Sequence, residues 1–137
     1  MKIDNLLKQM AEKPDLSSAL GMEFVPTSED DICMARMHVD ERNRQPFGFL
    51  SGGATLALAE TLAGFGSTCL CPDQISMGIN VSGQHLKAAV EGDTVIAKAT
   101  LKHKGNTIHV WDVEVKNSAG ELISTVSVTN YIINKNK

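Results

Sequence analysis

A single carboxylate interrupts the most apolar run of this sequence. From Gly52 to Phe65 the chain consists of glycine, alanine, leucine and threonine, apart from Glu60 and the closing phenylalanine. Because the alanines and leucines fall on every side of a helix, a helix through this run has to lie at the centre of the fold. An ionised glutamate there costs several kcal/mol unless a partner compensates its burial.

Two explanations of Glu60 are open at this point. A carboxylate in apolar surroundings has an altered reactivity, and active sites are built in this way. Alternatively, the helix lies at an oligomer interface, with Glu60 at a wet edge or paired with a cation.

Length, composition and charge exclude several classes of protein. The chain has 137 residues, 42% of them hydrophobic, which fits one domain over 1–137 with its own core. The net charge of −3 and the lack of a basic cluster argue against nucleic acid as a partner. Cys33, Cys69 and Cys71 form no CxxC pair, so we expect reduced thiols and no disulfide framework.

We also expect no membrane segment and no metal site. The first turns carry charges and no apolar stretch reaches the roughly 18 residues that span a bilayer, which predicts a cytoplasmic protein without a signal peptide. His85, His103 and His109 lack the close spacing with thiols or carboxylates that a metal site needs.

Hydrophobic periodicity predicts an α+β fold. Helical spacing indicates a short N-terminal helix over about 2–12, and the apolar run indicates a central helix over about 52–68. Alternation of apolar and polar residues predicts four one-sided strands, at 32–39, 75–82, 94–101 and 125–129. The apolar face of the second strand consists of Ile75, Met77, Ile79 and Val81. Turns at 104–106 and 117–120 predict hairpins, so we expect an antiparallel sheet wrapped around the long helix.

The start of the central helix suits an oxyanion. Ser51 is a candidate N-cap, and Gly52 and Gly53 remove the Cβ atoms where unpaired N–H groups point outward. Such donors fit the oxygen that becomes charged in acyl transfer. Glu60 is about 12 Å further along the axis, too far for one small reaction centre. In a two-fold dimer with antiparallel central helices, Glu60 of one subunit can lie beside the Gly52 amide of the other.

The stretch from Asp40 to Glu60 resembles the signature of hotdog-fold acyl-CoA thioesterases. The most similar subgroup acts on aryl-CoA and includes 4-hydroxybenzoyl-CoA thioesterase and 1,4-dihydroxy-2-naphthoyl-CoA hydrolase. Gln84-His85, Gly105 and Trp111 also match, and the order of strands and helices extends the resemblance over nearly the whole chain. It implies a hotdog fold, hydrolysis of a small acyl-CoA with an aromatic acyl group as one candidate, and no cofactor beyond the coenzyme A of the substrate.

The resemblance also implies roles for individual residues. Glu60 matches the catalytic carboxylate, which acts as nucleophile or as general base on water. Gly52 matches the residue whose backbone N–H polarises the thioester carbonyl, with Gly53 beside it at the substrate, and Gln45 matches a glutamine that orients the carbonyl or the water. The site is shared by two subunits of a homodimer, and dimers associate in pairs. Candidates for contacting coenzyme A are His85, Lys87, His103 and Lys104.

Two positions depart from the subgroup. Ser51, a further candidate for the catalytic site, stands where the subgroup usually has histidine. It can cap the helix with its side chain and donate a hydrogen bond, but it cannot titrate near neutral pH as an imidazole does. Gly64 stands where the subgroup often has serine or threonine, and it could widen the acyl pocket. Two functions therefore remain: a thioesterase that uses Glu60, Gly52 and Gln45, or a non-catalytic hotdog protein that binds acyl-CoA or an acyl group.

Overall fold

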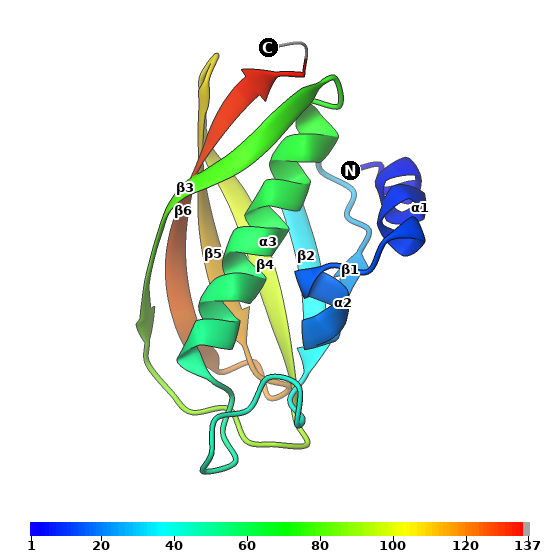
Figure 1. The fold of residues 1–137 in the computed structure, drawn as a ribbon. Helices are drawn as coiled ribbons and strands as arrows, with labels where there is room; N and C mark the ends of the chain where they lie inside the picture. The colour runs from blue at the N-terminus through cyan, green and yellow to red at the C-terminus, as the bar shows by residue number, and fades with distance from the viewer. Residues whose placement is uncertain (136–137) are drawn as a thin grey trace.

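A six-stranded antiparallel sheet curls around one long helix (Figure 1). The computed structural model describes residues 1–135, and the strand order is β1-β2-β4-β5-β6-β3. The helices are α1 (Asp4–Glu12), α2 (Leu16–Leu20) and α3 (Gly52–Leu70). The strands are β1 (Met22–Val25), β2 (Ile32–His38), β3 (Gln74–His85), β4 (Thr94–Lys104), β5 (Ile108–Lys116) and β6 (Leu122–Asn134). The predicted α+β plan is confirmed.

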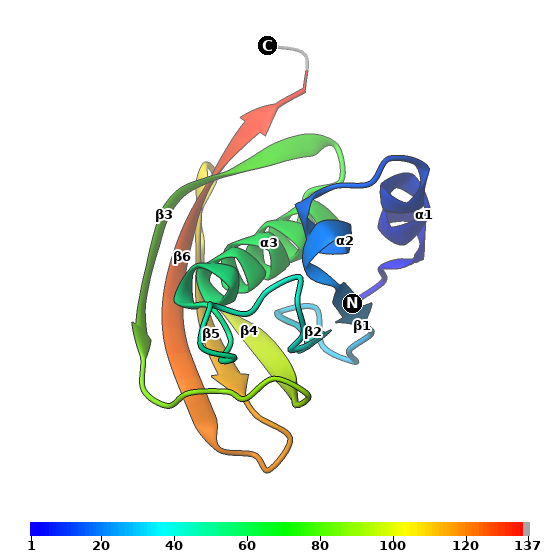
Figure 2. The same cartoon turned by 60° about the horizontal axis from the view of Figure 1, so that its bottom comes forward.

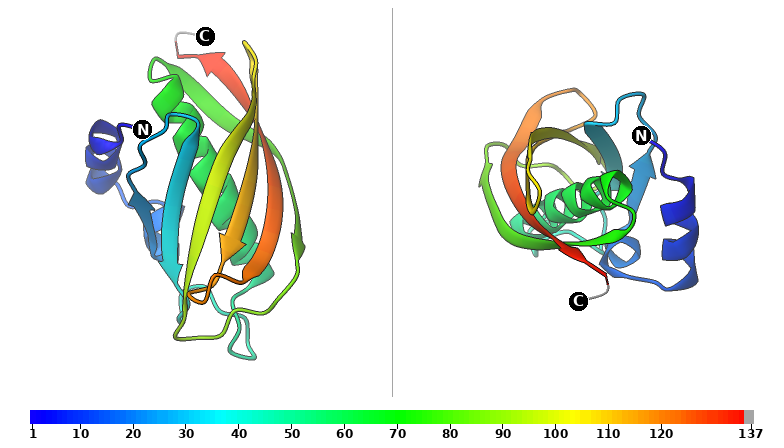
Figure 3. Two further views of the ribbon diagram at one scale, coloured as in Figure 1. Left: turned by 180° about the vertical axis from the view of Figure 1, so that it is seen from behind. Right: turned by 90° about the horizontal axis from the view of Figure 1, so that it is seen from above.

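The concave face of the sheet packs on α3, as the view from above shows (Figure 3). Alternate strand residues point inward, so Trp111, Val113 and Val115 of β5 are almost completely buried. Both predicted hairpins are present, joining β4 to β5 and β5 to β6. Gly120 closes the second turn at φ +81°, a conformation that favours glycine.

Helix α3 starts at the predicted residue and ends two residues later than predicted, at Leu70. Leu58, Ala59, Leu62 and Ala63 are fully buried against the sheet. The opposite side is only partly covered, because the edge strands β1 and β3 do not meet around it (Figure 2). The residues at helical spacing along this uncovered side are small: Gly53, Ala57, Thr61, Gly64 and Thr68.

The N-terminal helix is also confirmed, with bounds of Asp4–Glu12 against the predicted 2–12. It contains no fully buried residue and packs beside the sheet through a partly buried apolar stripe. Helix α2 and strand β1 were not predicted from the sequence. Asp15 caps α2 by accepting from the backbone N–H groups of Ser17 and Ser18, a local signal that could have identified this helix.

Strand β3 was predicted correctly as a strand, but its inward face was predicted wrongly. Ile75, Met77 and Ile79 are 42%, 53% and 59% exposed, whereas Ser76 and Gly78 face α3. A β-bulge between Gly78 and Asn80 then shifts the alternation, so that Val81 faces inward. The physical reason is Glu60, whose side chain fills the space beneath β3 and leaves room only for small residues there.

Candidate active site

A cavity of about 340 Å³ opens at the N-terminus of α3. Helix α3, the loop before it, the end of β3 and the start of β6 enclose it. The residues that matter for chemistry on its wall are Gln45, Gly52, Thr55, His85, Lys87 and Ser124.

The first turn of α3 keeps its backbone donors free. Ser51 is the N-cap residue as predicted, but its side chain accepts no hydrogen bond, so the predicted side-chain cap is wrong. The Ser51 carbonyl instead accepts from the Thr55 N–H at 3.0 Å, while its hydroxyl lies toward Gly53. Within residues 1–135 the Gly52 N–H has no acceptor, so it can donate to a ligand oxygen.

Gln45 is held by its own loop. Its side-chain Oε1 accepts from the Phe47 N–H, and its backbone N–H donates to the Phe49 carbonyl at 2.7 Å. Gly48 allows the tight turn between them at φ +88°. Because the loop occupies the carbonyl end of the Gln45 amide, the NH₂ end is available to donate to a substrate carbonyl.

His85 lies against the first turn of α3. Its Nδ1 is 2.9 Å from Ser124 Oγ, and its Nε2 is 2.8 Å from the position that a Cβ atom at Gly52 would take. Sequence reasoning assigned His85 only to coenzyme A, and no local signal linked it to Gly52, because β3 brings the two together. Lys87 lines the same cavity, and its ammonium group pairs with Glu121.

Glu60 is half-buried on the partly covered side of α3. Its carboxylate fits against Gly78, where an added Cβ atom would lie 2.7 Å from Oε2 and 3.0 Å from Cδ. No cation of the described chain pairs with it. Because eight helical residues separate it from Gly52 by about 12 Å, one chain does not bring the two together.

The other candidate residues lie at three further places. Ser51 and Gly53 line a second hollow of about 320 Å³ on the side of α3 that faces Arg42 and Arg44, whose guanidinium groups pair with carboxylates. Gly64 has open space, with no atom within 4 Å of its Cβ position. His103 and Lys104 lie at the β4–β5 hairpin. Lys104 pairs there with His109, and His109 contacts Ser67, which is fifteen helical residues, or about 22 Å along α3, from Gly52.

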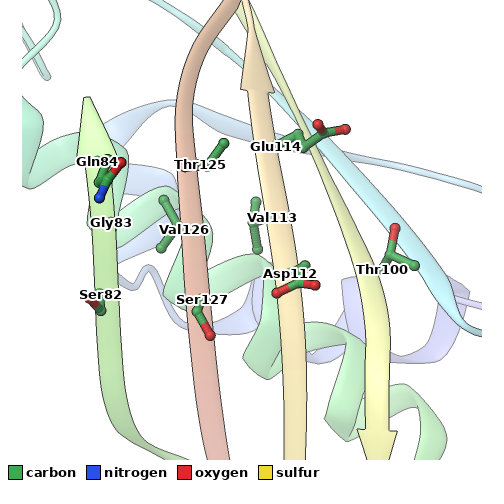
Figure 4. A pocket seen from close by; sticks show the side chains of 10 residues that line it. All are labelled: Ser82, Gly83, Gln84, Thr100, Asp112, Val113, Glu114, Thr125, Val126 and Ser127. Carbon is green, nitrogen blue, oxygen red and sulfur yellow. The ribbon is translucent and has the colours of Figure 1, made fainter. Parts of the chain in front are cut away.

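A further hollow, of about 630 Å³, lies on the convex face of the sheet (Figure 4). Its outward side chains come from β3, β4, β5 and β6, and its charged ones are the carboxylates of Asp112 and Glu114. Carboxylates repel the phosphates of coenzyme A, and α3 lies on the other side of the sheet. We therefore do not assign the reaction to this hollow.

Two of the three cysteine thiols are disfavoured as nucleophiles. Burial raises the pKa of the Cys33 thiol to about 12 and also raises that of Cys69, so neither is a ready thiolate nucleophile. Residues 1–135 contain no cluster of histidine, cysteine and carboxylate side chains suited to a metal ion. In the same residues no helix is long and apolar enough to cross a membrane.

Comparison with known proteins identifies the family. The model of the thioesterase superfamily matches residues 47–124, a segment that contains Gly52, Glu60 and His85. The chain is 39% identical to ComA2 of Bacillus subtilis, to which an esterase activity is ascribed, over 92% of this chain and all of that protein. It is 34% identical to the 1,4-dihydroxy-2-naphthoyl-CoA hydrolase of Escherichia coli over 76% of each chain.

A solved structure agrees with this result over nearly the whole chain. A thioesterase of Haemophilus influenzae superposes with a TM-score of 0.88 and 32% identity, covering 98% of this chain and 92% of that one. A curled antiparallel sheet around a central helix is the architecture that the sequence predicted. The chain therefore belongs to the thioesterase superfamily, and it is a hotdog-fold acyl-CoA thioesterase.

Proposed function

We propose that this thioesterase hydrolyses a small aromatic acyl-CoA at sites that two subunits form together. The observation that carries the proposal is the separation of Glu60 from Gly52 by about 12 Å along α3, with Gln45 in the loop before the Gly52 end. One thioester group cannot contact both ends of that interval. Two chains related by a two-fold axis, with their α3 helices antiparallel, bring the two halves together.

Strand β3 supports such a dimer. It is an edge strand, and an open edge carries unpaired backbone groups that favour pairing with another strand. Two residues of this strand contact α3: Gly78 lies against Glu60, and His85 lies against Gly52. If two β3 strands pair antiparallel about a point between Val81 and Ser82, Gly78 of one subunit lies opposite His85 of the partner subunit.

The partly covered side of α3 also supports the dimer. Gly53, Ala57, Thr61 and Gly64 are small, so the helix of a second subunit can approach closely. A further interface between dimers is supported by the exposed apolar row of Ile75, Met77 and Ile79 on β3. We therefore propose a dimer of dimers in which the inner dimer forms the site.

The reaction follows from these positions. The thioester oxygen accepts hydrogen bonds from the Gly52 N–H and the Gln45 amide. Glu60 of the partner subunit removes a proton from water, and the resulting hydroxide forms a C–O bond to the thioester carbon while the carbonyl electron pair moves to oxygen. When the C–S bond breaks, the coenzyme A thiolate takes the proton from Glu60. Direct attack by Glu60 followed by hydrolysis of the anhydride is the alternative route.

The substrate class is supported by two observations. The similar Escherichia coli protein is named for a bicyclic aromatic acyl-CoA, and Gly64 leaves open space one turn after Glu60 for a flat acyl group. For the coenzyme A phosphates, Lys87 is the candidate on the cavity, with His103 and Lys104 as candidates from the partner subunit. The chemistry needs no cofactor beyond the coenzyme A of the substrate. We also propose a cytoplasmic location, because reduced cysteines suit that compartment.

The test is hydrolysis of a panel of aromatic and aliphatic acyl-CoA thioesters by the purified protein. The release of free thiol measures the rate. We expect the highest kcat/KM with an aromatic acyl group. Glu60→Gln should lower kcat by at least about 100-fold without a change in melting temperature. Glu114→Gln, on the convex face, is the matched control and should match the wild type (Figure 4). Wild-type turnover by Glu60→Gln would refute the mechanism, and a preference for aliphatic substrates would refute the substrate class.

A further inference from the structure

The imidazole of His85 occupies a position that the mechanism above leaves unused. Nε2 lies 2.8 Å and Cδ2 3.0 Å from the point that a Cβ atom at Gly52 would take. The ring fills the space that Gly52 leaves beside the first turn of α3. It stands on the wall of the cavity that Gln45 also lines. Of the residues on this wall, His85 is the one with an imidazole.

Ser124 determines which ring nitrogen carries the proton. Nδ1 of His85 lies 2.9 Å from Ser124 Oγ, and Ser124 is fully buried. A buried hydroxyl needs an acceptor for its proton, and within residues 1–135 its side-chain partner is this ring nitrogen. When the hydroxyl donates to Nδ1, the neutral ring carries its own proton on Nε2. The Nε2–H group is then a donor beside the free N–H of Gly52.

We propose that the His85 Nε2–H is a third donor to the thioester oxygen, beside the Gly52 N–H and the Gln45 amide, and that Ser124 is a positioning residue that acts through His85. This inference rests on the proposed function. As the carbonyl electron pair moves to oxygen, the Gly52 N–H, the Gln45 amide and the His85 Nε2–H all donate to the oxyanion. No proton moves to or from His85, and collapse of the intermediate leaves the ring unchanged. Fixed donors of this kind stabilise the charge of the transition state more than that of the substrate.

Two substrates separate this role from binding of phosphate. One is an aromatic acyl-CoA, and the other is the same acyl group on N-acetylcysteamine, which has the thioester but lacks the nucleotide and its phosphates. We expect His85→Ala to lower kcat by about 100-fold on both substrates, with a much smaller change in KM. His85→Gln keeps a donor near the position of Nε2 and should recover at least about tenfold of that loss.

The matched control is His38→Ala. His38 is an exposed histidine of β2 that contacts Thr94 and lies outside the cavity, so its removal should leave both rates unchanged. Thermal melting verifies that each variant is folded. Ser124→Ala should lower kcat without raising KM, and Ser124→Thr, which keeps the hydroxyl, should restore it. Gly52→Ala, which pushes a methyl group into the ring, should cost less in the His85→Ala background than in the wild type.

Three results would overturn the inference. A rise of KM for the acyl-CoA alone, with unchanged rates on the truncated substrate, would make His85 a phosphate ligand. Equal losses in His85→Ala and His85→Gln, together with the loss of the acidic limb of the pH profile, would make it a general base. Unchanged kcat in His85→Ala, with Glu60→Gln still inactive, would refute only this inference, whereas a wild type inactive on the whole panel would refute the proposed function itself.

Discussion

Two glycine-to-alanine substitutions separate the chemistry of this fold from its packing. In Gly78→Ala the new methyl group lies 2.7 Å from Glu60 Oε2, whereas ordinary contact begins at 3.4 Å. The carboxylate therefore has to move by at least about 0.7 Å, and a displacement of about 1 Å at a reacting group costs up to 100-fold in rate. We expect kcat to fall by about 10- to 100-fold.

The same substitution should not destabilise the fold. The neighbour that must move is the end of a flexible side chain, and alanine is more favourable than glycine in a strand by about 0.5 to 1 kcal/mol. The melting temperature should stay the same or rise.

Gly66→Ala is the matched comparison within α3. Its methyl group would lie 2.7 Å from the Trp111 ring and 2.8 Å from Cys33 Sγ, and both neighbours are buried and cannot retreat. Overpacking costs about 1 to 3 kcal/mol, of which the better helix propensity of alanine returns about 1 kcal/mol. A net loss of up to about 2 kcal/mol lowers the melting temperature by up to roughly 10 °C.

Circular dichroism melts and initial rates of thiol release measure both variants. Gly66→Ala should be less stable with wild-type kcat per folded molecule, and Gly78→Ala should show the reverse. If Gly78→Ala kept wild-type kcat, Glu60 would not react from its position against β3, and the assignment of this carboxylate would be wrong.

Three further predictions concern the rest of the molecule. Ser51→His should leave kcat within about twofold of wild type, because Ser51 faces the hollow with Arg42 and Arg44 instead of the cavity with Gln45; a large gain would contradict this. Burial lowers the pKa of His109, so the unfolded state takes up its proton first, and stability should fall as the pH drops below about 6.5 toward the folded pKa. Melts from about pH 7.5 to 5.5 test this, and His109→Gln should flatten the profile. Met77→Asp should convert a tetramer into a dimer that is still active, as measured by light scattering and by an activity assay. An unchanged mass would show that β3 does not form the interface between dimers.

Much of the architecture could be predicted because local patterns specify it. The run from Gly52 has no polar face, so a central helix was the only way to bury it, and its first residue was predicted correctly. Both hairpin turns contain a glycine that marked them in the sequence, Gly105 in the first and Gly120, at φ +81°, in the second. Gly52, Gln45 and Glu60 were singled out from the sequence, and the structure gives each of them a defined setting.

The parts that were missed depend on contacts between distant residues. The inward face of β3 is decided by Glu60, which needs Gly78 opposite it, and no pattern within the strand contains that requirement. The bulge after Gly78 changes the alternation within one strand, so a constant period of two assigns the wrong face. The position of His85 beside Gly52 likewise depends on the path of β3 across the helix.

The most direct test of the shared site is complementation between two inactive subunits. Glu60→Gln lacks the carboxylate, and Gly52→Val blocks the first turn of α3 by colliding with His85. When the two variants are unfolded, mixed in equal amounts and refolded together, half of the dimers are mixed, and each mixed dimer has one intact site. We therefore predict recovery of about one quarter of wild-type activity, whereas either variant refolded alone stays inactive. Refolded mixtures that form mixed dimers by mass spectrometry but stay inactive would contradict a site built from two subunits.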